Sequence, residues 1–304
     1  MEINPKKEKP ITYTISSLNA ENLFHQIDNG QVLTIKKITS DEKDLTAENL
    51  IIDFVKNKAI QMKYIKRGND LLSLNVEKLE LNEYSYSFNA LFSIESKKAS
   101  ILNPDFTIYN HLYSQGVNIR RKPLYSERLR KLNMKFNFEK IEIINGKIAY
   151  EEHDQLANLP GKISLSKINA SIKNFKNKDS INDLITVDVN FNFMNAAPSK
   201  VNWTMRMYNP KDSFTFKGNI KNLKADRLNL FTINTINIKS EGKIDDVYFD
   251  FKGNDYDATA TMDLNYKDFK VLLLKEKSKK ERKLLNAIVN IFTKRENKNK
   301  NEKN

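Results

Sequence analysis

The chain has 304 residues, no cysteine, and a formal net charge of +13 from 51 basic and 38 acidic residues. The absence of cysteine excludes disulfide bonds, a thiol nucleophile and zinc sites built on thiolates. More than half of the net charge falls within residues 275–304, where basic residues outnumber acidic ones by seven.

The N-terminal region predicts neither a signal peptide nor a membrane span. Residues 1–10 are charged and lack the apolar core of a signal peptide. The longest purely apolar run in the chain, Val271–Leu274, is far shorter than the roughly 20 residues of a membrane-spanning helix. The first expected element is a short helix over Leu18–Asp28. Every second residue from Tyr86 to Ile94 is apolar, which predicts a strand.

The middle of the chain predicts a short helix and then a β-hairpin. The helix is expected over Leu124–Leu132, and alternation of apolar and polar residues begins at Phe136. The Asn145-Gly146 pair is a strong signal for a two-residue hairpin turn. Alternation resumes at Ile148, which predicts the return strand.

The later part of the chain predicts strands with one apolar and one polar face. Apolar residues occupy every second position in 185–193, 201–207 and 258–266, a pattern typical of antiparallel sheet. A further short helix is expected over Ala225–Phe231.

The C-terminal segment predicts an amphipathic helix over about 278–294. Ser278 and Glu281 form a capping box at its start. Two interpretations stay open: a helix lying on a membrane surface, or a helix packed on the protein's own strands. Beyond Glu296 the composition is typical of disorder. The candidate membrane-surface residues are Leu284, Leu285, Ile288, Ile291 and Phe292.

Catalytic and metal-binding patterns are absent from the sequence. His25, His111 and His153 are far apart, and the cluster Glu151–Asp154 follows a strand, where neighbouring side chains point to opposite faces. No phosphate-binding loop, HExxH helix or nucleophile elbow occurs. Aromatic residues alternate on the apolar face and do not interleave with basic ones, which argues against nucleic-acid binding. We therefore expect no enzyme, no cofactor and no catalytic or metal-binding residue.

Two segments resemble the AsmA-like family of bacterial envelope proteins, in its Bacteroidetes form. The first combines Pro123–Arg130 with Ile141–Glu152, and the second combines Gly218–Leu230, Ile238–Phe249 and Ala258–Leu274. AsmA-like proteins are related to lipid-transfer proteins with a β-groove. Together the two segments span residues 120–292, over half of the chain.

The resemblance implies a non-catalytic protein of the cell envelope that accommodates or conducts lipid acyl chains along an apolar groove. It implies a periplasmic location at the inner membrane, with an envelope lipid such as a phospholipid, the membrane surface and other envelope proteins as partners. Family members usually begin with a membrane anchor that residues 1–10 do not supply, so we expect a fragment, a misplaced start or a different anchoring. The candidate lining residues are Phe191, Phe193, Trp203, Met205, Met262 and Leu264.

We expect an all-β fold: an elongated, twisted antiparallel sheet, with few short helices. The expected regions are a β-rich part (1–120), an AsmA-like module (121–274) and a helix with a basic tail (275–304). The helices are too few to cover so many strands. Periodicity alone favours a second sheet packed on the first as a sandwich, whereas the resemblance favours a sheet curled into an open groove. A sandwich would suit an alternative function, binding another envelope protein through an edge strand.

Overall fold

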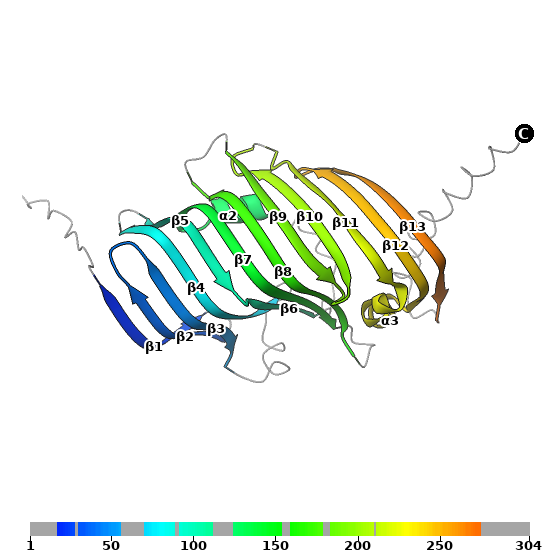
Figure 1. Ribbon diagram of the computed structural model, residues 1–304, viewed down its shortest axis with the longest axis horizontal. Coiled ribbons are helices and arrows are strands. Elements are labelled where there is room, and N and C mark those ends of the chain that lie inside the picture. The colour runs from blue at the N-terminus through cyan, green and yellow to red at the C-terminus, as the bar shows by residue number, and fades with distance from the viewer. Residues whose placement is uncertain are drawn as a thin grey trace, which may run out of the picture.

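The protein is built around one sheet of 13 strands, seen in the computed structural model of Figure 1. The sheet is mainly antiparallel, elongated and twisted, with β1 at one edge and β13 at the other. The prediction of an all-β fold with few helices is confirmed. The structure describes residues 17–27, 30–55, 70–88, 91–111, 124–153, 159–178, 183–209 and 211–274.

The strands follow one another along the sheet in chain order, with β6 placed between β4 and β7. The first six are β1 (Leu18–Ile27), β2 (Gln31–Ser40), β3 (Leu45–Phe54), β4 (Leu71–Phe88), β5 (Phe92–Leu102) and β6 (Asp105–His111). The others are β7 (Met134–His153), β8 (Gly161–Lys176), β9 (Leu184–Phe193), β10 (Ala197–Arg206), β11 (Phe214–Lys224), β12 (Ile238–Gly253) and β13 (Ala258–Leu273). The helices are α2 (Tyr125–Arg130), the 3-10 helix η1 (Ala225–Leu228) and α3 (Asn229–Ile236).

Strands β5 and β6 behave as one strand that is interrupted at Asn103 and Pro104. Both pair antiparallel with β4 and parallel with β7, and the register against β7 is the same on either side of the interruption. Proline has no N–H for the ladder, so it breaks the strand while the sheet continues. These parallel pairs depart from the expected antiparallel pattern. They also join strands on both sides of residue 121 in one sheet.

Aligned bends curve the sheet. Asn22, Asn49, Asn103 and Asn145 have positive φ angles of 49–54°, which asparagine tolerates better than most residues. The register places the four in one row across β1 to β7, and the Asn145 side-chain amide donates to Asn103 Oδ1 at 2.7 Å. Irregularities of this kind bend a strand and increase its twist. A row of them therefore bends the sheet from β1 to β7.

The bends also explain where simple alternation fails. Leu79, Leu81 and Tyr84 pack in one cluster although two polar residues, Asn82 and Glu83, separate the last two. Glu83 has a positive φ of 46° and is ion-paired with Lys97 on β5. Each bend therefore shifts the apolar pattern by one position and keeps the apolar side chains on the same side.

Two expected elements are wrong for this reason. The expected helix over Leu18–Asp28 is strand β1, because the bend at Asn22 gives its apolar residues a helix-like spacing. The expected hairpin turn at Asn145-Gly146 is a bend inside β7, which continues to His153.

Three further predictions concern the strand at Tyr86–Ile94, two short helices and the C-terminal helix. The stretch Tyr86–Ile94 contains the end of β4 and the start of β5, which pair with each other instead of forming one strand. The helices expected at Leu124–Leu132 and Ala225–Phe231 are present as α2 and as η1 with the start of α3. The expected C-terminal helix and tail lie outside the described residues.

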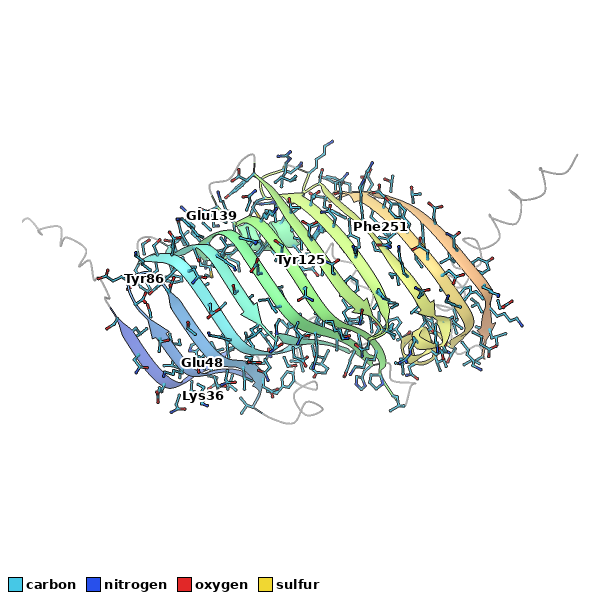
Figure 2. The ribbon with its side chains drawn as sticks, viewed as in Figure 1. Lys36, Glu48, Tyr86, Tyr125, Glu139 and Phe251 are labelled. Carbon is cyan, nitrogen blue, oxygen red and sulfur yellow. The ribbon has the colours of Figure 1, made fainter. Side chains whose placement is uncertain are left out.

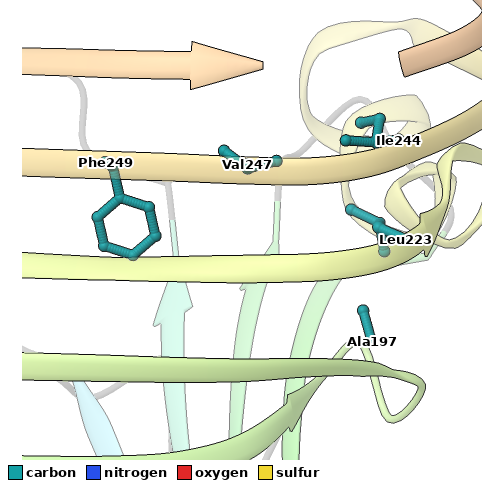
Figure 3. Close-up of a cluster of buried hydrophobic side chains, with 5 residues drawn as sticks. All are labelled: Ala197, Leu223, Ile244, Val247 and Phe249. Carbon is teal, nitrogen blue, oxygen red and sulfur yellow. The ribbon is translucent and has the colours of Figure 1, made fainter. Parts of the chain in front are cut away.

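The sandwich that periodicity alone favours is not found, because every strand that the structure describes belongs to the same sheet. Apolar side chains instead form local clusters on one sheet. The cluster in Figure 3 joins Ala197 of β10 and Leu223 of β11 to residues of β12, including Phe249. A single layer leaves most apolar side chains half-exposed.

Helix α3 fills a notch in one end of the sheet. Leu165 pairs with Phe193, the last residue of β9, so β8 extends four residues past the end of the β9–β10 hairpin. Helix α3 occupies this space beside β8 and β12 (Figure 1). A Cβ at Gly161 would overlap Cγ2 of Thr235, so only glycine allows this close approach.

Candidate functional site

Apolar side chains from all strands of the main sheet path align on one side, which we call the apolar face. The register connects one row of residues directly from β1 to β13, and eleven of its twelve members are apolar. The row is Leu18, Ser40, Leu45, Leu81, Ala99, Ile141, Ile172, Val187, Trp203, Phe216, Phe251 and Ala260.

A second row runs parallel to the first, closer to α3. It crosses seven strands, from β3 to β10, and includes β6. Its members are Ile52, Leu74, Phe106, Ile148, Leu165, Phe193 and Ala197. The two rows together make a surface that is apolar along the full strand order and several residues deep.

Little covers the apolar face in the described part of the chain. Leu129 of α2 packs against the cluster that contains Met205, and Leu228 of η1 packs against the cluster around Ala197. The two helices therefore lie near opposite ends of the strands. Figure 2 shows the side chains along the sheet, with Tyr125 of α2 and Phe251 of β12 labelled. Several large apolar residues stay exposed, among them Phe88 at 75 %.

The opposite side of the sheet carries charged pairs. Glu142 accepts hydrogen bonds from Lys140 and Lys98, which lower the pKa of its carboxyl. Lys217 pairs with Asp250 at 3.0 Å. The sheet therefore has one charged and one apolar side, as the alternation predicted.

The candidate lining residues all belong to the strands expected of them. Phe191 and Phe193 lie on β9, and Trp203 and Met205 lie on β10, where Trp203 pairs with Val187 of the long row. The exposed fractions of these side chains differ. Met205 is only 6 % exposed, because α2 lies over it.

The remaining two candidates lie on the edge strand β13. Met262 pairs with Phe249 and is 45 % exposed, whereas Leu264 packs on the cluster around Phe249. The candidate set missed the N-terminal strands. Their apolar pattern is shifted by bends, and runs such as apolar–polar–polar–apolar are the signal that could have found them.

A pocket lies between α2 and the end of the apolar face. It encloses about 260 Å³, and its exposed wall is almost entirely apolar. The rings of Tyr125 on α2 and Trp203 on β10 meet edge-to-face with centroids 5.7 Å apart. The lining residues are Leu124, Tyr125, Ser126, Trp203, Met205, Asp212, Phe214 and Phe216.

Helix α2 is fixed at its C-terminal end by buried polar contacts. The fully buried Asn177 accepts from the Phe136 N–H at 2.9 Å and donates to the carbonyls of Leu129 and Met134 at 3.1 and 2.8 Å. Arg130 forms a two-pronged ion pair with Asp212, which raises the pKa of the guanidinium. Asn177, directly after β8, and Asp212, just before β11, therefore fix the position of α2 over the pocket.

In the acidic cluster after Tyr150, the carboxylates of Glu151 and Glu152 bind to other side chains of the protein. Glu151 pairs with Lys162 at 3.2 Å, and Glu152 accepts from the Tyr150 hydroxyl at 2.7 Å. Burial and this hydrogen bond raise the pKa of Tyr150. No group of residues that could hold a metal ion is found among the described residues. His25 lies on β1, far from β7.

The parallel pairing of β6 with β7 does place the backbone of His111 opposite that of His153. The sequence alone did not predict this pairing, because parallel strands pair segments that are far apart in the sequence.

Comparisons with known proteins give no family for the chain. No protein-family model matches it, and no curated protein matches it significantly. Within the described residues, no helix has the length and apolar character needed to cross a membrane.

Proposed function

We propose that the protein binds lipid acyl chains along its apolar face. The observation that carries this proposal is the row of paired apolar residues that runs from Leu18 on β1 to Ala260 on β13 without a second sheet over it in the described residues. Contiguous exposed apolar surfaces beyond a few hundred Å² are rare on soluble proteins and mark binding sites. A face of this length suits a long apolar ligand.

The chemistry of the face fits alkyl chains. Its side chains are aliphatic and aromatic, and each methylene that leaves water for such a surface contributes about 0.8 kcal/mol. The paired charges lie on the opposite side of the sheet and do not interrupt the apolar face. Apart from Ser40, the members of the two described rows are apolar and supply neither a nucleophile nor an acid–base pair, and the role that we propose is non-catalytic.

The proposal extends to the place of action. The resemblance of Ile141–Glu152 and Gly218–Phe249 to AsmA-like segments supports a role in the bacterial envelope, with phospholipid or another envelope lipid as the ligand. The fold is compatible with this resemblance, since β-groove proteins also expose one apolar face of a long sheet.

Site-specific photo-crosslinking tests the proposal. A benzophenone amino acid at Phe216, on strand β11 of the apolar face, should form adducts with phospholipid in living cells. The same amino acid at the neighbouring Lys217, on the charged face, is the matched control and should not. Equal lipid adducts at both positions, or only intramolecular products at Phe216, would contradict the proposal.

The outermost strands of the described sheet favour a second candidate function, pairing with a strand of another envelope protein. Strand β13 has no partner on its outer side among the described strands, and nearly all of its residues are exposed. Its first half, Ala258–Leu264, carries one charge and none of the bulges that usually protect an edge. A crosslinker at Thr261 should then capture one defined partner through a strand of that partner. Adducts with many unrelated proteins would contradict this role.

A further inference from the structure

The pocket beneath α2 differs from the rest of the apolar face because it has a roof. Phe214 and Phe216 of β11 and Trp203 of β10 form its floor, and Leu124 and Tyr125 lie above. Over most of the described apolar face a ligand would contact protein from one side only. In this pocket it would contact protein from two sides, which strengthens binding.

Asp212, the charged residue among the described lining residues, already has a partner. Both carboxylate oxygens of Asp212 accept from Arg130, and the Asp212 side chain is 4 % exposed. Arg130 also donates to the Met207 carbonyl. The charge of Asp212 in the pocket wall is therefore neutralised by Arg130 and offers no charge to a ligand. An uncharged apolar group is the ligand that fits.

The size of the pocket limits that group. An apolar cavity of about 150 Å³ is enough to hold benzene. The pocket encloses about 260 Å³, so it holds a group nearly twice as large. The aromatic floor and roof form a slot, which suits a linear alkyl segment better than a branched or bulky group.

We propose that the pocket beneath α2 is a binding site for the terminal segment of a single acyl chain. The methyl end of the chain lies in the pocket beside the contacting rings of Tyr125 and Trp203, and its remainder lies over Phe216 and Phe251 on the apolar face. The inference takes its ligand class from the proposed function, but it assigns one site and one orientation on the face. The roofed site anchors each lipid at its tail and leaves the headgroup outside.

The single tryptophan of the chain makes this site directly observable. Trp203 lines the pocket, and bromine atoms on an acyl chain quench tryptophan fluorescence only at close range. The full chain is titrated with two fatty acids, one brominated near the methyl end and one near the carboxylate. We expect the methyl-end bromines to quench Trp203 at least twofold more strongly. Equal or reversed quenching would overturn the proposed orientation.

A second reporter separates this inference from the proposed function. The double variant Trp203→Phe, Tyr86→Trp moves the tryptophan to β4, on the N-terminal part of the apolar face. Quenching at Trp203 in the parent chain, stronger than at the moved reporter, supports the pocket. Quenching at the moved reporter alone overturns the pocket while the proposed function stands. Quenching at neither position overturns both.

Removing the roof tests the same site by affinity. Tyr125→Ala takes away the aromatic contact above Trp203 and should weaken fatty-acid binding by about three- to tenfold. Tyr256→Ala is the matched control, because Tyr256 is 85 % exposed and lines no part of the pocket. Ser126→Leu, which fills the pocket from α2, should weaken binding as well, with circular dichroism as the check on folding. Unchanged affinity in folded Tyr125→Ala protein would overturn the proposal.

Discussion

Replacement of Asn177 by alanine tests how α2 is held over the sheet. The Asn177 side chain is fully buried and joins three segments: the end of β8, the C-terminal end of α2 and the start of β7. It accepts from the Phe136 N–H and donates to the carbonyls of Leu129 and Met134. Alanine leaves these three backbone groups without that partner inside the protein.

The expected loss of stability follows from these three hydrogen bonds. Each contributes a net ~0.5–1.5 kcal/mol, and a buried group left unsatisfied costs at the upper end of that range. We expect Asn177→Ala to lower the free energy of unfolding by about 2–4 kcal/mol. The loss should also loosen α2, because the Asn177 amide holds the carbonyl of Leu129 in its last turn.

Urea unfolding followed by Trp203 fluorescence measures this loss, since Trp203 contacts α2 through Tyr125. Asn202→Ala is the matched control. The Asn202 amide donates to Asp188 in an exposed hydrogen bond, so its removal should cost less than about 0.5 kcal/mol. Equal losses in the two variants would refute the reasoning that burial decides the cost.

Three further predictions concern the notch, the bends and the charged face. Gly161→Ala should destabilise the protein by about 1–3 kcal/mol through overlap with Thr235, and Thr235→Ser, which removes the overlapping methyl, should restore part of the loss in urea titrations. Asn145→Ala should cost about 1–2 kcal/mol because the residue has a positive φ, whereas Asn145→Gly should cost less in the same assay. The lowered pKa of Glu142 adds stability that is present above its unfolded pKa near 4.5 and is lost as the pH falls. Glu142→Gln should therefore lose less stability than the parent between pH 5 and pH 3, and an identical pH dependence would contradict this.

The sequence predicts the strands of the C-terminal half well and those of the N-terminal half poorly, for a physical reason. Residues 185–193 and 201–206 form straight strands without a bend, so strict alternation survives in them. The bends at Asn22 and Asn145 shift the pattern by one residue, and a shifted strand looks like a helix or a hairpin turn.

The candidate site was only partly predictable. Alternation identified Phe193 and Trp203 as members of an apolar side, because this depends on the local pattern alone. The single-layer sheet and the pocket beneath α2 depend on contacts between distant segments, such as Tyr125 with Trp203 and Arg130 with Asp212. No local pattern encodes those contacts.

Native mass spectrometry of the protein purified from its cells tests the central claim most directly. We predict bound lipid in the spectrum of the parent chain and its loss in the double variant Phe216→Lys, Phe251→Lys, which places two charges side by side on the apolar face. The variant Lys217→Glu, on the charged face, should retain the lipid. A parent protein without lipid, or a double variant that retains it while folded, would contradict the assignment of the apolar face to acyl chains.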